Sequence, residues 1–468
     1  MAQLLFILYL LSVIGGIVIV LGEERSAVSS IPWILVVIFL PVVGLLLYII
    51  FGYSLRRKQL IDVEVRQALS DAPVETKSLP STEAEEVADL KLTSLSALIE
   101  RLTDTPLTTA NELTHYDDSR EWLVACRDAI AQAQHYIYIE LYRIEEGPWL
   151  DALLDLLAER IQEGVALYWL YDDVGSRSLS RRYRKRMEQL GGQVAAFLPV
   201  RFRLLTSRVN YRNHRNLVVV DGAVGFTGGN VLLSELQHLP QGAQPLATTH
   251  LRISGLAVRQ LEYSFALDWY VATQQLLSPQ QSSSTMTTAE LIKMQIFPTH
   301  PTDDFPSLEM ILTQAFLQAR QSLYIESPVL IPTNSIQQAL ISTALSGVQV
   351  RVILPRRGRS WLAPKASHAF FTDLLRAGVE IYYYDGLREA TYAVIDKECV
   401  VTGTPYLDFR SFEYNFDLTT IAYSSEVARQ FVDSFETTLA LCHRIALRRN
   451  RLWRRIAHGV MRLLTPLI

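Results

Sequence analysis

A single histidine stands at the start of an apolar, strand-like run, and this position suits it to nucleophilic chemistry. The stretch NHRNLVVVDGAVGFTGGN, residues 213–230, has His214 just before the run and Asp221 directly after it. A neutral imidazole is abundant near pH 7 and can act as a nucleophile. Asp221 comes seven residues later, so in an extended strand it meets His214 only if the chain turns back or across the fold. The sequence leaves that contact open.

A second stretch repeats this pattern without the histidine. TYAVIDKECVVTGTPY, residues 391–406, has Asp396 after its apolar run and Gly403 seven positions beyond, just as Asp221 precedes Gly228. Earlier landmarks recur in the same order. The first copy opens with YIYIE and continues to LGGQVAAF, and the second opens with SLYIE and continues to AGVEIYYY. An internal repeat of this kind predicts two similar halves that face each other across one shared site.

The elements that must position these residues are short apolar runs alternating with helical patterns, which is typical of α/β proteins. We predict two pseudo-symmetric α/β halves, residues 110–285 and 286–440, each with a mainly parallel sheet. The polar, acid-rich composition of residues 59–109 predicts a linker or stalk. Residues 441–468 combine many Arg with apolar residues at helical spacing, which favours an interfacial amphipathic helix over a core helix.

The first part of the chain is far more apolar than the rest. Uncharged runs over 4–21 and 31–52 are each close to the roughly 20 residues that cross a bilayer. We therefore expect an all-α transmembrane hairpin over 1–58, with a cleaved leader followed by one anchor as the alternative. Basic residues 56–58 follow the second run at once, which places the bulk of the protein in the cytoplasm.

The overall composition excludes several classes of function. Lys and Arg number 44 against 48 Asp and Glu, so the chain lacks the basic excess of a nucleic-acid-binding protein. Cys126, Cys399 and Cys442 are scattered without the spacing of metal ligands. They indicate a reducing compartment rather than a disulfide framework or a zinc site.

Taken together, these motifs resemble the phospholipase D superfamily and, within it, the bacterial cardiolipin synthases. The matching stretches are the N-terminal apolar hairpin, LYDDVGS at 170–176, THLRISG at 249–255, DWY at 268–270, GTPYLDFRSFEYNFD at 403–417 and RLLTPLI at 462–468. The resemblance implies a multi-pass protein of the bacterial inner membrane that transfers a phosphatidyl group between two phosphatidylglycerol molecules. It implies no metal and no other cofactor.

The family builds its active site from two copies of H-x-K-x4-D, one in each half. One His is the nucleophile and forms a phosphohistidine, the other protonates the leaving alcohol, the Lys hold the phosphate and the Asp orient the imidazoles. Here the first copy keeps His214 but has Asn216 at the Lys position. The second copy has Glu389 at the His position and Thr391 at the Lys position, and Tyr406 stands where an Asn is expected.

These replacements change what the site can do. Asn and Thr donate hydrogen bonds but carry no charge, and loss of a stabilising group at a reacting oxygen typically costs about 10²–10³ in rate. Arg212 shares strand parity with His214 and could supply charge, whereas Arg215 points to the opposite face. A bound phosphate and a nearby Asp396 would raise the pKa of Glu389 and let it act as the acid.

The expected catalytic residues are His214, Asp221, Glu389 and Asp396. The expected phosphate-binding residues are Asn216, Thr391, Arg212, Gly228, Gly403 and Thr404. Two main functions remain open: a weakened cardiolipin synthase-like phosphatidyltransferase, and an inactive relative that binds anionic phospholipid or regulates an intact enzyme. A phosphodiesterase with another substrate is a third. The expected partners are anionic phospholipid, the membrane, and a second copy or an intact relative, without nucleic acid.

Overall fold

The computed structural model describes residues 2–22, 27–48, 65, 90–200, 209–229, 247–277, 292–357, 362–447, 456 and 458–462. Most of the predicted linker, the basic residues 56–58 and most of the C-terminal segment lie outside these described residues.

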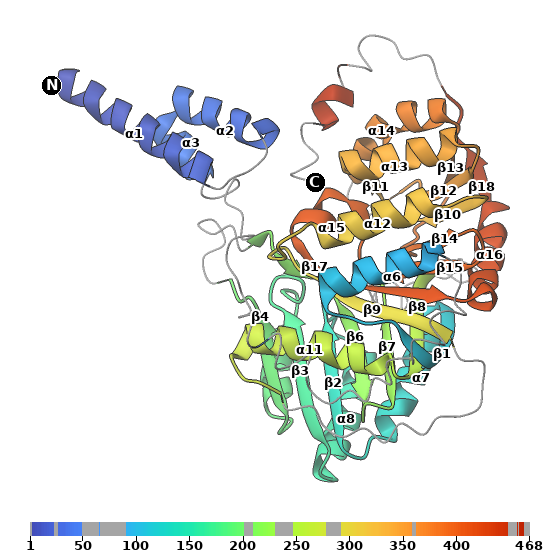
Figure 1. Ribbon diagram of the computed structural model, residues 1–468. Coiled ribbons are helices and arrows are strands. Elements are labelled where there is room, and N and C mark those ends of the chain that lie inside the picture. The colour runs from blue at the N-terminus through green and yellow to red at the C-terminus, as the bar shows by residue number, and fades with distance from the viewer. Residues whose placement is uncertain are drawn as a thin grey trace.

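One mixed sheet runs through both halves of the molecule (Figure 1). The first half contributes β1 (Thr108–Asp118), β2 (Tyr136–Leu141), β3 (Ala166–Asp172), β4 (Gln193–Phe197), β5 (Arg212–Asn213), β6 (Asn216–Val220), β7 (Val224–Gly228) and β8 (Ala247–Gly255). The second half contributes β9 (Ile292–Thr299), β10 (Ser322–Glu326), β12 (Gln349–Pro355), β13 (Glu380–Tyr384), β14 (Tyr392–Ile395), β15 (Cys399–Gly403), β17 (Asn415–Tyr423) and β18 (Cys442–Arg444). A separate small sheet pairs β11 (Leu330–Ile331) with β16 (Leu407–Asp408).

The strand order repeats from one half to the other. The first half has the order β4-β3-β2-β6-β7-β8-β1, and the second has β13-β12-β10-β14-β15-β17-β9. The two halves join where β1 pairs with β9 in antiparallel fashion. The internal repeat seen in the sequence is therefore a repeat of topology, although the exact boundaries of the two halves stay a prediction.

Most strand pairs of the main sheet are antiparallel, so the prediction of a mainly parallel sheet is wrong. Parallel pairing is confined to β2-β3-β4, β10-β12-β13 and the short β5 beside β17. The reason lies in the connections. The apolar run after His214 returns through a tight turn at residues 221–223, and a turn this short can join only antiparallel neighbours.

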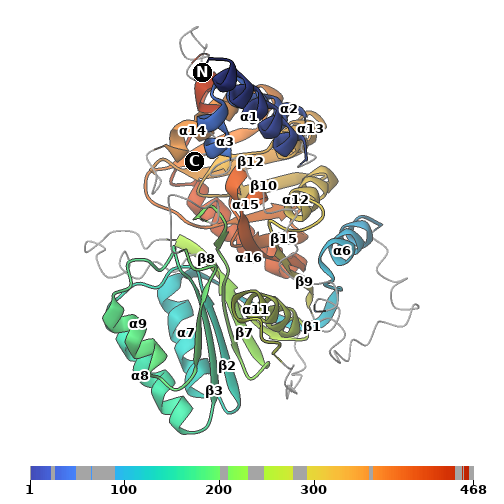
Figure 2. The same ribbon diagram turned by 90° about the vertical axis from the view of Figure 1, so that its left-hand side faces the viewer.

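Helices cover both faces of the sheet (Figures 1 and 2). They are α6 (Leu90–Thr103), α7 (Ser119–Ala131), α8 (Pro148–Gln162), α9 (Arg181–Glu188), α11 (Val258–Thr273), α12 (Ser307–Gln318), α13 (Asn334–Leu345), α14 (Ala363–Ala377), α15 (Phe409–Glu413) and α16 (Ser425–Leu439). Apolar residues at helical spacing explain their faces. In α8, Leu150, Leu153, Leu154 and Leu157 fall at i, i+3, i+4 and i+7, and all four are buried.

The two halves share one hydrophobic core in addition to their own. Phe265 and Trp269 of α11, from the first half, belong to the same buried cluster as Phe431 and Phe435 of α16, from the second. Two further clusters lie within single halves. Because the shared cluster spans both halves, neither can separate without exposing apolar surface.

Helix α6 lies within the segment 59–109 that the sequence predicts to be a linker. Its Leu95 and Ile99 are buried among Phe297, Leu308 and Ile311. This part of the segment therefore packs on the second half.

Three N-terminal helices, α1 (Ala2–Gly22), α2 (Ala27–Phe39) and α3 (Pro41–Leu47), form a group beside the α/β body (Figure 1). Pro41 stands at the start of α3 and divides the second apolar run into two helices. Gly16 of α1 lets the helices approach closely, because a Cβ there would lie 2.5 Å from Val37 Cγ1 of α2. Within the part of the chain that the structure describes, no helix combines the length and the apolarity needed to cross a membrane. The predicted transmembrane hairpin is therefore not confirmed.

Candidate active site

His214 lies between β5 and β6, where the first half meets the second. Its backbone N–H donates to the carbonyl of Phe416 on β17 at 2.9 Å, and β5 pairs with the same strand. The imidazole packs on the Tyr142 ring, with 4.1 Å between the ring centroids. His214 is thus placed by a strand of the opposite half, as a shared site requires.

The Asn415 amide contacts the His214 ring. Asn415 Nδ2 lies 3.3 Å from His214 Nδ1, while Asn415 Oδ1 is buried and has no hydrogen-bond partner among the described residues. An Asn amide can present either its NH₂ group or its oxygen to a neighbour. With the oxygen facing the ring, Nδ1–H donates to Oδ1 and the lone pair of Nε2 is left for attack. No sequence pattern predicted this contact, because the two residues are 201 positions apart.

The environment of His214 keeps the imidazole neutral. Burial, helped by the positive charges of Arg410 and Arg212, lowers its pKa to about 3. A neutral ring at physiological pH is the nucleophilic form. Arg410, from α15, did not emerge from the sequence as a site residue, although it lies within the matching stretch GTPYLDFRSFEYNFD at 403–417.

The two arginines beside His214 in sequence lie on different sides of the strand. Arg212 Nη1 donates to Asp172 Oδ1 at 3.3 Å, and both side chains are buried. Asp172 also accepts from the backbone N–H of Asn213 at 3.0 Å. Burial raises the pKa of Asp172, against the opposing effect of Arg212. Arg212 therefore lies near His214 but is held in an internal ion pair.

Arg215 anchors the opposite side of the strand. Its guanidinium pairs with Asp268, and both side chains are fully buried. Arg215 Nε also donates to Asp417 O at 3.0 Å, and Nη2 donates to Thr299 O at 3.0 Å. These contacts tie the His214 strand to β9 and β17 of the second half, so Arg215 positions the site and does not face a substrate.

Asp221 and Asp396 lie at the far ends of their strands, and the structure does not bring either one to the imidazole. Asp221 accepts the backbone N–H groups of Gln134, His135 and Tyr136, each at 2.8 Å. Asp396 does the same for residues 320–322 at 2.7–3.0 Å.

Both aspartates have positive φ, +53° and +52°. A strand of seven residues spans about 23 Å. The prediction that these aspartates orient the catalytic groups is therefore wrong. Asp396 also does not act on the carboxyl of Glu389, which removes one reason for expecting an acid there.

Glu389 is buried, with 3% of its surface exposed. Its Oε2 accepts from the Tyr406 hydroxyl at 2.7 Å. It lies at the boundary of the halves, because a Cβ on Gly229 would be 3.5 Å from Glu389 O. The connection to His214 runs through Ser411, whose Oγ is 3.5 Å from Asn415 Nδ2 and accepts from Tyr406 N at 3.0 Å. Tyr406 therefore contacts Glu389 through its hydroxyl, while its backbone N–H leads through Ser411 to Asn415, the residue beside His214.

The residues at the two Lys positions are bonded to the backbone around them. Asn216 Oδ1 accepts from Tyr142 N at 3.1 Å, and its Nδ2 donates to Gly229 O at 3.4 Å. Thr391 Oγ1 donates to Glu389 O at 3.4 Å. These short side chains support the strands that carry His214 and Glu389.

The glycines that end β7 and β15 permit close strand approach. A Cβ on Gly228 would lie 2.4 Å from Thr249 O, and one on Gly403 would lie 2.2 Å from Leu418 O. Thr404 Oγ1 donates to Asp417 Oδ1 at 2.6 Å. The described contacts of all three predicted phosphate-binding residues are therefore internal to the fold.

Asp417 is a second titratable group that the sequence did not single out. Its carboxyl is fully buried, and burial raises its pKa to about 7 in spite of the hydrogen bond from Thr404. It lies on β17 two residues after Asn415, so the two side chains share one face of the strand. The strand that holds His214 thus also carries a carboxyl that changes charge near neutral pH.

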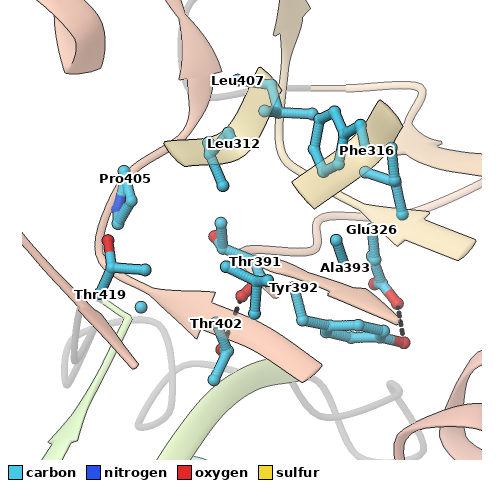
Figure 3. Close-up of a pocket in the computed structure, with 13 residues that line it drawn as sticks. Leu312, Phe316, Glu326, Thr391, Tyr392, Ala393, Thr402, Pro405, Leu407 and Thr419 are labelled. Atoms are coloured by element: carbon cyan, nitrogen blue, oxygen red, sulfur yellow. Dashed lines mark hydrogen bonds between the residues drawn. The ribbon is translucent and has the colours of Figure 1, made fainter. Parts of the chain in front are cut away.

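A small cavity lies inside the second half, behind Thr391 (Figure 3). Leu312 and Phe316 line it together with Glu326, which accepts from Tyr392 at 2.9 Å. Its volume of about 30 Å³ holds one or two waters. It is too small for a lipid headgroup. Elsewhere in the described ranges, no group of three or more His, Cys, Asp or Glu is arranged to hold a metal ion.

Comparison with known proteins identifies the family. The family described as "Cardiolipin synthase, PLD-like domain" matches residues 312–439, and "Phospholipase_D-nuclease N-terminal" matches residues 5–52. Cardiolipin synthase 1 of Bacillus anthracis is 31% identical over 99% of this chain and 93% of its own length. The major cardiolipin synthase ClsA of Bacillus subtilis is 29% identical over 99% of both chains.

Solved structures agree with this at the level of the fold. Phosphatidylserine synthase of Haemophilus influenzae covers 80% of this chain and 98% of its own, with a TM-score of 0.57 at 11% identity. Polyphosphate kinase of Porphyromonas gingivalis covers 76% of this chain and 53% of its own, with a TM-score of 0.50 at 12% identity. With the identity to the Bacillus anthracis relative extending over nearly the whole chain, this protein belongs to the phospholipase D superfamily and, within it, to the bacterial cardiolipin synthase-like proteins.

Proposed function

We propose that this protein is a phosphatidyltransferase of the cardiolipin synthase type, which uses His214 as its nucleophile and a remodelled second half. The observation that carries this function is a neutral imidazole at the boundary of the halves, held by Phe416 and Asn415 of the second half. The names of relatives that align over nearly the whole chain support the same reaction.

In the first step, His214 Nε2 attacks the phosphorus of one phosphatidylglycerol. The P–N bond forms as the bond to the headgroup glycerol oxygen breaks, and that oxygen takes up a proton as glycerol leaves. In the second step, a hydroxyl of another phosphatidylglycerol attacks the phosphohistidine and gives up its proton. The P–N bond breaks, cardiolipin is released, and His214 is regenerated without a cofactor.

The proton for the leaving glycerol comes from the pair formed by Glu389 and Tyr406. The Tyr406 hydroxyl donates to Glu389 Oε2 at 2.7 Å, so this pair holds a proton that can move toward an adjacent alkoxide. In the absence of both motif lysines, Arg410 is the cation best placed to stabilise the phosphate, because its charge already acts on His214.

Helices α1 to α3 hold the chain at the bacterial inner membrane, with the α/β body in the cytoplasm and two crossings, as the sequence predicts. The match of residues 5–52 to the N-terminal family supports this. So does the apolar surface of these helices, where Leu11, Val18 and Phe39 are 61%, 63% and 76% exposed.

Turnover of phosphatidylglycerol tests the reaction. We expect the purified full-length protein in phosphatidylglycerol vesicles to release cardiolipin and glycerol, with an acid-labile phospholipid adduct on His214 detected by mass spectrometry. His214→Ala should abolish both product and adduct. Glu389→Gln should slow glycerol release about 10²-fold or more, since an amide cannot exchange a proton with the Tyr406 hydroxyl as the carboxyl does.

The matched control is His135→Ala, because His135 is exposed in a loop outside the site. It should leave turnover unchanged. An adduct that persists in His214→Ala, or full turnover in Glu389→Gln, contradicts the assigned roles.

The alternative function is a non-catalytic relative that binds anionic phospholipid or regulates an intact enzyme, and one observation favours it. The side chains at both Lys positions and at the second His position are bonded to their neighbours. Phosphatidylglycerol binding that survives His214→Ala, with neither adduct nor cardiolipin in either protein, identifies this function.

A further inference from the structure

A cavity of about 810 Å³ lies at the outer edge of the second half, away from His214. Its walls are α14, the ends of β12 and β13, β18 with the residues after it, and the C-terminal turn 458–462. A volume of several hundred Å³ is typical of sites that take a small molecule. The proposed reaction does not use this region.

The α14 wall changes from charged to apolar along its length. Lys365 and His368 face the cavity near the start of the helix, and Phe371 and Leu375 face it further on. Lys365 and Leu375 are separated by about 15 Å along the helix axis, at 1.5 Å per residue. The wall is therefore cationic at one end and hydrocarbon-like at the other.

The β18 wall also changes from charged to apolar residues, in the same direction as the α14 wall. His443 pairs with Tyr383 of β13, and Ile445 N donates to Ile381 O at 2.8 Å. Leu447, which lines the cavity further on, is 52% exposed. Because β18 is antiparallel to β13, its charged residues lie at the carboxyl end of β13, which is also the end where α14 begins.

The charged end carries more positive than negative groups. Arg356 and Lys365 line it, whereas the side chain of Arg444, also in the lining, pairs with Glu380 at the start of β13 at 2.8 Å. Among the described residues of the lining, Asp385 is the only acidic one, and it contacts Arg356 at 3.0 Å. The end of the cavity therefore has an excess of cationic charge suited to an anion.

The C-terminal turn forms the third wall. Arg462 Nη2 donates to Ala369 O and to Asp373 Oδ2, each at 2.8 Å, and the guanidinium packs over the Phe370 ring. These contacts hold His458 and Met461 against the cavity. Figure 2 places α14 and this turn at the same end of the molecule as α1, α2 and α3.

We infer that this cavity binds one anionic phospholipid, with its phosphate at Arg356 and Lys365 and an acyl chain along Phe371, Leu375 and Leu447. The lengthwise order of charge and hydrocarbon on two facing walls matches that of a phospholipid, and a free phosphate would leave the apolar end unused. Binding here does not depend on chemistry at His214.

Photo-crosslinking of the full-length protein in detergent micelles tests this site. The probe is phosphatidylglycerol with a photoreactive group in one acyl chain, and mass spectrometry maps the adduct. We expect adducts in the segments 371–375 and 445–447. The double variant Arg356→Ala with Lys365→Ala should reduce them about thirtyfold, because each basic group near a lipid phosphate contributes about 1 kcal/mol.

Three comparisons make the outcome decisive. Arg120→Ala with Arg127→Ala removes two exposed cations from the first half and should leave labelling unchanged, as should His214→Ala. Leu447→Ser changes only an exposed side chain and should lower the labelling yield. Equal labelling by a phosphatidylcholine probe, full labelling of the Arg356/Lys365 variant, or competition by glycerol 3-phosphate as strong as that by dihexanoyl phosphatidylglycerol would each overturn the inference.

Discussion

At the scale of single residues, the site combines one imidazole of the first half with side chains of the second. Asn415 contacts the His214 ring, and the positive charge of Arg410 lowers the pKa of the imidazole. Glu389 accepts a hydrogen bond from the Tyr406 hydroxyl. His214 and Glu389 are predictions of the sequence, because each occupies a defined place in the repeat. Asn415 and Arg410 are not, because contacts across about 200 residues are set by how the halves dock and leave no local pattern.

Replacing Arg410 should reveal its electrostatic role. Because the positive charge of Arg410 disfavours the imidazolium form, Arg410→Ala should raise the pKa of His214 from its value of about 3. NMR titration of the labelled imidazole measures this shift whether or not the protein turns over. If transfer occurs, the same variant should lose about 10²-fold in kcat.

Arg410→Lys is the matched control, since it keeps the charge near the ring. It should leave the His214 pKa close to that of the unaltered protein. An unchanged pKa in Arg410→Ala would mean that burial and Arg212 set the low value without Arg410.

At the scale of elements, each half repeats one unit, in which an apolar strand ends in an aspartate with positive φ. Asp221 and Asp396 each accept backbone N–H groups from the loop that precedes the neighbouring strand. The sequence revealed the strand, the aspartate and the turn, because all three are local. It could not show that the carboxylate turns away from the site, and the family motif suggested the opposite. The parallel sheet was mispredicted for a similar reason, since strand direction depends on connections that alternation alone does not specify.

Removing one of these aspartates should reduce stability rather than chemistry. Asp396→Ala leaves three backbone donors without their acceptor and puts Ala at a φ of +52°. We expect the free energy of unfolding to fall by about 3 kcal/mol. Denaturant unfolding in detergent measures this change.

Glu398→Ala, at an exposed position on the same turn, should change stability by less than about 0.5 kcal/mol. A drop in turnover per folded Asp396→Ala molecule, without a loss of stability, would return this residue to the active site.

At the scale of the whole molecule, a continuous sheet and a shared core make the two halves one unit. Buried ionisable groups then link its stability to pH. Burial lowers the pKa of His250, which packs on Trp122, to about 3, and His214 has a similar value. Since the unfolded imidazole has a pKa of about 6.5, the stabilisation is complete above that pH and is lost as the pH falls toward 3.

Comparing the unaltered protein with His250→Gln isolates one of these groups. Between pH 7 and pH 5, the unaltered protein should lose about 2 kcal/mol more of its unfolding free energy than the variant does. Asp417, whose raised pKa acts in the opposite direction, is common to both proteins and cancels. Unfolding curves in detergent at the two pH values test this, and identical pH dependence of the two proteins would contradict it.

The antiparallel seam between β1 and β9 has a consequence for the origin of the chain. Equivalent edge strands meet there, as they do when two copies of one small protein assemble about a twofold axis. Fusion of the genes for such a homodimer ties the copies at a fixed ratio and ends the need for them to remain identical. Each half of such a fused chain can then change independently, and the position that holds His214 in the first half holds Glu389 in the second.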